Sequence, residues 1–166
     1  ADDTSLALTA ARSDGEAAYA DRMMDGAKFA RENLGLRFRH KPESQLLTGI
    51  DLQAYYNYID HVMDNYSLRR FVPSMMMPGF SVSNPDRRTS GGRVAFDLAG
   101  ARWQATLGAD WQQNRHRDRS SMNQVAMPYE RLARIEDARF DNAGVFGEVT
   151  IPTHQRQRLI GGARVD

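Results

Sequence analysis

A strand pattern runs through Ile50-Asp51-Leu52-Gln53-Ala54-Tyr55-Tyr56-Asn57-Tyr58-Ile59-Asp60-His61-Val62-Met63-Asp64 and decides the fold. From Ile50 to Tyr58 the even positions are apolar or aromatic and most odd positions are polar, which is the period-two signature of a β-strand with one apolar face. His61 and Met63 project to the polar side. Residues two apart on a strand are separated by roughly 7 Å, so an imidazole nitrogen and a thioether sulfur can lean onto one metal ion. The pair is a candidate metal half-site.

The same alternation recurs on both sides of this stretch. It predicts six further strands, over residues 5–12, 33–39, 93–98, 103–112, 145–151 and 159–166. The central strand, taken from Gln45 to Met63, is too long for an ordinary buried strand but suits one that extends beyond a bilayer. We therefore expect an all-β fold with about seven strands.

The connections between these strands alternate between long and short. The long ones cover residues 13–32, 64–88 and 113–141, and the short ones cover 40–44, 100–101 and 152–155. Three long structureless loops argue against a compact soluble domain, whereas long extracellular loops and short periplasmic turns are typical of outer-membrane barrels. We predict a transmembrane antiparallel β-barrel segment with its apolar face toward lipid. The alternative from another class is a soluble β-barrel binding module, in which that face would be the core.

Composition narrows the functional classes. The 166 residues carry a formal charge of +1, with 26% charged and 41% hydrophobic residues, which gives no indication of a nucleic-acid partner. The sequence has no apolar window long enough for a transmembrane helix, and its first residues lack the features of a signal peptide. Phosphate-binding loops, nucleophile elbows and HExxH motifs are also absent from it. Polar wall residues such as Asp51, Asp97 and Glu148 are explained more simply by a hydrated lumen, or by ion pairs with an internal plug, than by catalysis, so we do not expect an enzyme.

All eight methionines fall in the predicted long loops or at the strand rim that leads into one. They are Met23, Met24, Met63, Met75, Met76, Met77, Met122 and Met127. Methionine ordinarily fills cores, so its exclusion from the apolar strand positions is unusual. Soft thioethers favour Cu(I), and imidazole accepts copper in either oxidation state. Met75, Met76, Met77, Met23 and Met24 are therefore candidates for metal capture by the loops, the alternative being that they only pack the loops together.

Four segments resemble one family of membrane receptors. They are 58–69, with its His61-Val62-Met63 run, 21–26, 144–148 and 158–164. Together they are similar to the middle of the barrel of a TonB-dependent outer-membrane copper receptor. The two C-terminal segments are typical of TonB-dependent receptors in general, and the His-Val-Met run is the part specific to copper.

The resemblance implies a 22-stranded barrel closed by an N-terminal plug, in the outer membrane of a Gram-negative bacterium, with energy supplied by the TonB complex. It implies that copper is a transported ligand rather than a catalytic cofactor, held by His61 and Met63 together with a Cys and a Met of the plug. Residues 1–166 then form a partial barrel domain in contact with outer-membrane lipid, and the plug that reaches the TonB complex is not in this chain. A receptor for a metal chelate of the siderophore type is the alternative within the same superfamily.

Overall fold

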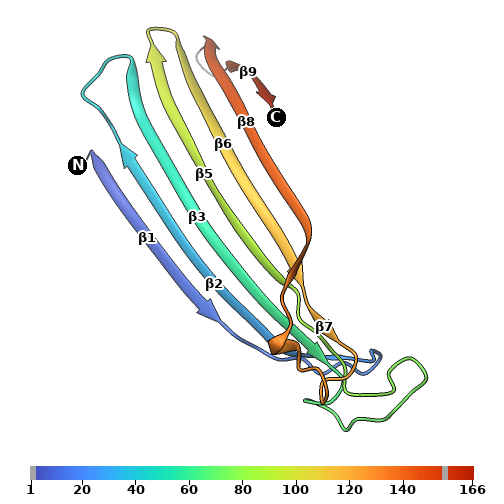
Figure 1. Ribbon diagram of the computed structural model, residues 1–166. Helices are drawn as coiled ribbons and strands as arrows, with labels where there is room; N and C mark the ends of the chain where they lie inside the picture. The colour runs from blue at the N-terminus through green and yellow to red at the C-terminus, as the bar shows by residue number, and fades with distance from the viewer. Residues whose placement is uncertain (1–2, 155–156) are drawn as a thin grey trace.

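The computed structural model describes residues 3–154 and 157–166, and these form one curved antiparallel sheet (Figure 1). The long strands are β1 (Thr4–Ser13), β2 (Asp25–His40), β3 (Leu47–Asp64), β5 (Asp86–Gly100), β6 (Trp103–Asp118), β8 (Ile135–His154) and β9 (Gln157–Val165). The short elements are β4 (Val82–Ser83), β7 (Ser120–Ser121) and the 3-10 helix η1 (Tyr129–Arg131). Within the described ranges, no helix is long and apolar enough to cross a membrane.

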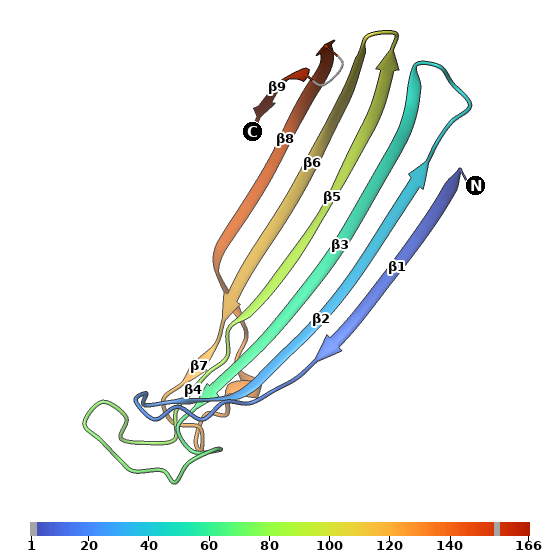
Figure 2. The ribbon, with the colours of Figure 1, turned by 180° about the vertical axis from the view of Figure 1, so that it is seen from behind.

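Each long strand pairs with the long strands next to it in the sequence, in the order β1-β2-β3-β5-β6-β8-β9. Connections 41–46 and 101–102 lie at one end of the sheet, the turn end, and connections 14–24, 65–85 and 119–134 lie at the other, the loop end (Figures 1 and 2). Strand β4 pairs with both β3 and β7, which ties two of the long loops together. The predicted seven long strands and the alternation of long and short connections are confirmed.

The predicted strand boundaries at the loop end are wrong. The structure starts β2 at Asp25, β5 at Asp86 and β8 at Ile135, and it extends β6 to Asp118, inside segments predicted as loops. The strands continue past the apolar band into a region where both faces are polar, so the alternation ends while the backbone pairing persists. The predicted turn at 152–155 is also wrong in part, because Pro152 pairs with Arg158 and β8 runs to His154; Gln155 lies outside the described residues.

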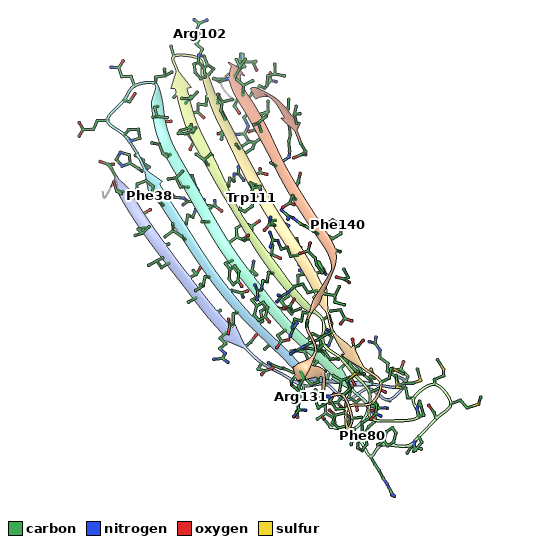
Figure 3. All side chains as sticks on the ribbon, viewed as in Figure 1. Phe38, Phe80, Arg102, Trp111, Arg131 and Phe140 are labelled. Atoms are coloured by element: carbon green, nitrogen blue, oxygen red, sulfur yellow. The ribbon has the colours of Figure 1, made fainter. Side chains whose placement is uncertain are left out.

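One face of the sheet, the apolar face, carries the apolar positions of every long strand. A single row of paired residues across the seven strands consists of Leu6, Phe38, Leu52, Val94, Ala109, Val145 and Val165. The side chains of the apolar face do not form a core. On this face Leu8 is 75% exposed and Trp111, labelled in Figure 3, is 46% exposed. A sheet with an exposed continuous apolar face requires another apolar medium against it.

The opposite face, the polar face, is lined with charged and hydrogen-bonding groups. Arg37 and Arg39 both donate to Asp51, at 2.6 Å and 2.9 Å, and Arg164 donates to Asp110 at 2.6 Å. These partners lie on the wall itself, so ion pairs with a plug are not needed to balance these carboxylates.

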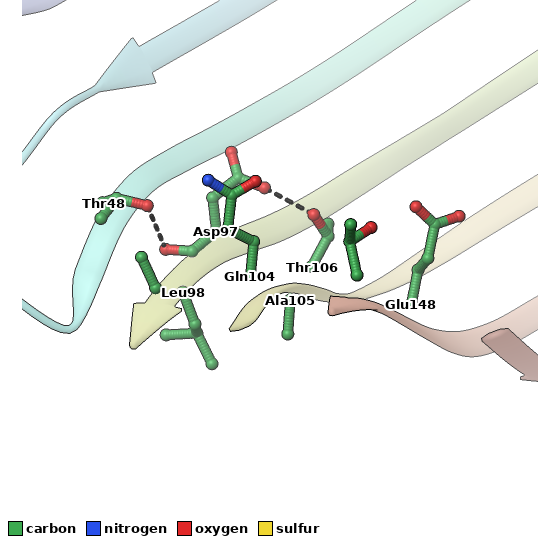
Figure 4. Close-up of a pocket in the computed structure, with 9 residues that line it drawn as sticks. Thr48, Asp97, Leu98, Gln104, Ala105, Thr106 and Glu148 are labelled. Carbon is green, nitrogen blue, oxygen red and sulfur yellow. Dashed lines mark hydrogen bonds between the residues drawn. The ribbon is translucent and has the colours of Figure 1, made fainter. Parts of the chain in front are cut away.

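A hollow of about 360 Å³ near the turn end shows the separation of the two faces. In Figure 4 the side chains of Asp97, Gln104 and Glu148 lie on one side of the strands, whereas Leu98 and Ala105 point to the other. Thr106 on the polar side donates to Asp97 at 2.7 Å. This polar face has the character of a hydrated lumen.

Candidate metal site

His61 and Met63 lie on the polar face of β3, close to the loop end. The partner of His61 on β2 is Phe29, and the two rings stack with their centroids 4.3 Å apart and 30° between their planes. Met63 is opposite Gly26, and a bulge separates Gly26 from Lys28. A Cβ atom at Gly26 would overlap the Phe29 ring, so this ring lies over the glycine that faces Met63. Phe29, His61 and Met63 thus form one cluster, which we call the rim cluster.

The imidazole of His61 has an unsatisfied nitrogen. Nε2 is buried, and no described residue forms a hydrogen bond with it. Burial lowers the pKa of His61, an effect that the neighbouring Asp60 carboxylate opposes. The side chain therefore favours the neutral form, which is the form that binds metals. A buried polar atom without a partner costs free energy unless something else satisfies it, and a metal ion beside a thioether can do so.

Hydrogen bonds fix the backbone of His61 on both sides of the residue. Its N–H donates to the Pro85 carbonyl at 3.0 Å, and its carbonyl accepts from Asn84 Nδ2 at 2.9 Å. Asn84 is only 1% exposed, and the same Nδ2 also donates to Asp60 Oδ1 at 2.7 Å. The segment just before β5 therefore sets the position of the His61 backbone.

An ion network covers the apolar-face side of the same strand ends. We call Lys28, Asp60, Asp86, Arg117 and Arg134 the rim network. Arg134 Nη2 is 2.7 Å from Asp60 Oδ1 and Arg134 Nη1 is 3.0 Å from Asp86 Oδ2, while Lys28 donates to Asp60 at 2.8 Å. Arg117 Nε donates to Asp86 Oδ1 at 2.9 Å. Burial raises the pKa of Asp60, but the hydrogen bonds from Lys28, Arg134 and Asn84 outweigh it and lower the pKa to about 2. The network holds loop 119–134, which carries Arg134, against the strands.

Contacts of Arg69, which we call the Arg69 clamp, join loop 14–24 to loop 65–85. Arg69 Nε donates to Asp25 Oδ2 at 2.6 Å, and its other nitrogens donate to the carbonyls of Arg22 and Tyr19, each at 2.7 Å. The Asp25 side chain is 1% exposed, and its Oδ1 accepts from the Tyr19 N–H at 2.8 Å. The Arg69 guanidinium lowers the pKa of Asp25 to about 2. One arginine thus holds the two loops together.

Acid is expected to open this clamp. Because the folded-state pKa of Asp25 lies below its ordinary value of 3.8, its contribution to stability is present above that value and is lost as the pH falls through about 2. Cleavage by pepsin at Phe71 or Phe80, normalised to an unstructured peptide, should rise between pH 4 and pH 2. In Asp25→Asn these sites should already be open at pH 4. Equal cleavage of the two proteins at pH 4 would contradict the clamp.

The loop methionines differ in exposure. Met75 and Met76 are 103% and 70% exposed, and Met23 is 49% exposed, whereas Met24 is half-buried. Met77 is also half-buried, and its sulfur accepts from Asn65 Nδ2 at 3.7 Å. Met77 therefore packs the loop, and Met23, Met75 and Met76 remain accessible to an arriving ion.

Of the predicted site residues, His61 and Met63 lie together in the rim cluster, whereas the predicted capture methionines lie in loops 14–24 and 65–85. Over the described ranges, no three His, Asp or Glu side chains meet in a group that would hold a metal ion. Sequence reasoning missed Phe29 and Asn84. The alternation could not assign Phe29 to His61, because residues 13–32 show no clear alternation and are predicted as a loop, whereas β2 starts at Asp25.

The architecture defines a class of protein. An antiparallel sheet with one apolar and one polar face, long loops at one end and short turns at the other, is the wall of a transmembrane β-barrel.

Comparison with known proteins agrees. A family described as TonB dependent receptor-like, beta-barrel matches residues 1–166, and the chain belongs to this family. This assignment removes the alternative of a soluble binding module. Among solved structures, one named copper transporter OprC has 44% sequence identity and a TM-score of 0.90. The match covers 99% of this chain and 26% of that chain, so the chain spans about a quarter of that protein. No curated protein sequence matches the chain.

Proposed function

We propose that residues 1–166 are part of the barrel domain of a TonB-dependent receptor that takes up copper across the outer membrane of a Gram-negative bacterium. One observation carries the proposal: the buried Nε2 of His61 has no partner among the described residues and lies on the polar face two residues from Met63. The 44% identity to a protein named copper transporter supports copper as the ion.

In this proposal copper is cargo and the receptor has no catalytic role. Exposed thioethers of Met75, Met76 and Met23 catch the ion at the loop end, and His61 and Met63 then hold it on the lumen side. Imidazole and thioether together suit copper better than the hard ions that prefer carboxylates. Two ligands make half a site, so the remaining ligands come from a plug domain, and the TonB complex acts on that plug to release the ion inward.

Copper accumulation in cells tests the function. A strain that lacks its own copper receptor is complemented with the full-length receptor, and cell-associated copper is measured at low external copper. We expect accumulation that depends on the receptor and on TonB, with no comparable accumulation of zinc. Receptor-dependent accumulation of a ferric chelate without copper accumulation would instead favour the chelate receptor.

Phe29 is expected to position the His61 imidazole. Removing the ring in Phe29→Ala frees the imidazole to rotate, and residues that support a metal ligand typically change metal affinity by about 10- to 100-fold. We expect a loss near the lower end of this range, measured as copper affinity of the purified full-length receptor. Phe140→Ala is a matched control, because Phe140 packs edge-on against His116 at 6.0 Å on the same face. Equal effects of the two substitutions would contradict a specific role for Phe29.

The exposed loop methionines are expected to affect capture rather than retention. In Met75→Leu/Met76→Leu the side chains keep their size but lose their sulfur atoms. The initial rate of copper uptake at low copper should fall several-fold, while the copper affinity of the purified receptor stays unchanged. Val72→Leu, an exposed change in the same loop, is the control for loop packing. An unchanged uptake rate would mean that these methionines do not take part in capture.

A further inference from the structure

Three arginines lie side by side on the apolar face, beyond the end of the apolar band. Arg88 of β5 is paired with Arg115 of β6, and Arg115 is paired with Arg139 of β8. The register therefore places three like charges in one row across three strands, which we call the arginine row. Like charges directly opposite each other destabilise a sheet unless something compensates them.

The position of this row corresponds to the headgroup level of a membrane. Tyr58 is the partner of Arg88 on β3, and the Arg88 guanidinium lies over the Tyr58 ring, 5.5 Å from its centroid. Trp111 lies on the same face of β6 as Arg115, four residues closer to the turn end, which is roughly 14 Å along the strand. Tyrosine and tryptophan on the lipid side of a barrel mark its interfaces with water, so the row lies where lipid headgroups begin.

Two carboxylates near the row, Asp86 and Asp141, are already engaged. Asp86 binds Arg117 and Arg134, and Asp141 accepts from Arg139 at 2.6 Å and from Gln113 at 2.8 Å. Within the described ranges, neither Arg88 nor Arg115 forms an ion pair, and the buried Nε of Arg115 has no hydrogen-bond partner. Among the described residues, Arg88 and Arg115 thus keep unpaired positive charge in the arginine row, and Arg88 and Arg139 are exposed.

We propose that the arginine row binds the phosphate groups of phosphorylated lipids in the outer leaflet, an inference that rests on the membrane placement proposed above. Guanidinium groups bind phosphate through two parallel hydrogen bonds. The apolar face continues from the row toward the turn end. A lipid that carries phosphate on its headgroup therefore contacts the arginines and the apolar face at once. Free phosphate would satisfy only the arginines.

Binding of a purified lipid tests the proposal. The full-length receptor in uncharged detergent is titrated with diphosphorylated lipid A, with its dephosphorylated form and with inorganic phosphate, and bound molecules are counted by native mass spectrometry. The test variant is Arg88→Gln/Arg115→Gln/Arg139→Gln. The matched control is Arg87→Gln, which removes the neighbouring charge of β5 on the polar face. We expect roughly 100-fold weaker binding of diphosphorylated lipid A by the triple variant, since each basic residue near an anionic lipid surface contributes about five- to six-fold, and an unchanged affinity in Arg87→Gln.

The other outcomes overturn specific parts of the inference. Equal lipid A binding by the wild type and the triple variant would refute the arginine row, and binding of inorganic phosphate as tight as that of lipid A would refute the lipid as ligand. Copper binding separates this inference from the transport function, because the triple variant should bind copper normally. Flotation with vesicles separates it from the membrane placement, since a receptor that fails to enter vesicles refutes the placement itself.

Discussion

Replacing His61 and Met63 together by alanine is expected to lower the copper affinity of the full-length receptor by more than about 100-fold, beyond the range that supporting residues usually show. Both changes remove a donor atom directly. His61→Ala alone should account for most of the loss, because its Nε2 is buried without another partner among the described residues and its burial favours the metal-binding neutral form. The affinity is measured by competition with a copper chelator, and cell-associated copper should fall in parallel.

His116→Ala is the matched control for this double variant. His116 lies on β6, is also half-buried, and likewise contacts an aromatic ring, that of Phe140. Its partner on β5 is Arg87, whose positive charge on the same face makes it a poor site for a cation, so its loss should leave copper affinity unchanged. The half-site would be refuted if His61→Ala/Met63→Ala kept wild-type affinity, or if His116→Ala reduced affinity as strongly.

Removing the guanidinium in Arg134→Ala is expected to give the second largest effect, on the stability of the loop end. The side chain is 12% exposed and joins Asp60, Asp86 and Asn84. Breaking a buried ion pair by removing one partner typically costs about 3–5 kcal/mol. We expect the lower part of this range, because Lys28 and Arg117 remain beside the two carboxylates. Loop 119–134 should detach, and trypsin should cleave after the exposed Arg131, which lies at the loop end in Figure 3.

Arg102→Ala tests whether this effect is local. Arg102 is an exposed arginine in the turn at the opposite end of the sheet (Figure 3). Its removal should change neither the urea concentration at which the protein is half unfolded nor the rate of trypsin cleavage after Arg131. If Arg134→Ala also cleaves at the wild-type rate, the rim network does not hold the loop.

The sequence was sufficient to predict the sheet because the lipid-facing band requires strict alternation. Every predicted strand corresponds to a long strand, and the row from Leu6 to Val165 is apolar throughout. The strand ends were not predictable in the same way. At Asp60 and Asp86 the apolar positions have given way to charged ones, and ion pairs join the strands there in addition to backbone pairing.

The candidate site was predictable only in part. His61 and Met63 share a face because they are two residues apart on one strand, which local periodicity reveals. Phe29 and Asn84 come from other strands and loops, so their positions depend on strand pairing beyond the apolar band and on long-range hydrogen bonds. Whether the pair binds copper remains a proposal that the double variant tests.

Asp60 and His61 are consecutive residues whose side chains leave the wall in opposite directions. A single peptide unit therefore links Arg134, through Asp60, to the imidazole on the other side of the wall. A change that breaks the Arg134–Asp60 ion pair on one side of the wall is therefore expected to shift the backbone of His61, whose side chain lies on the other side.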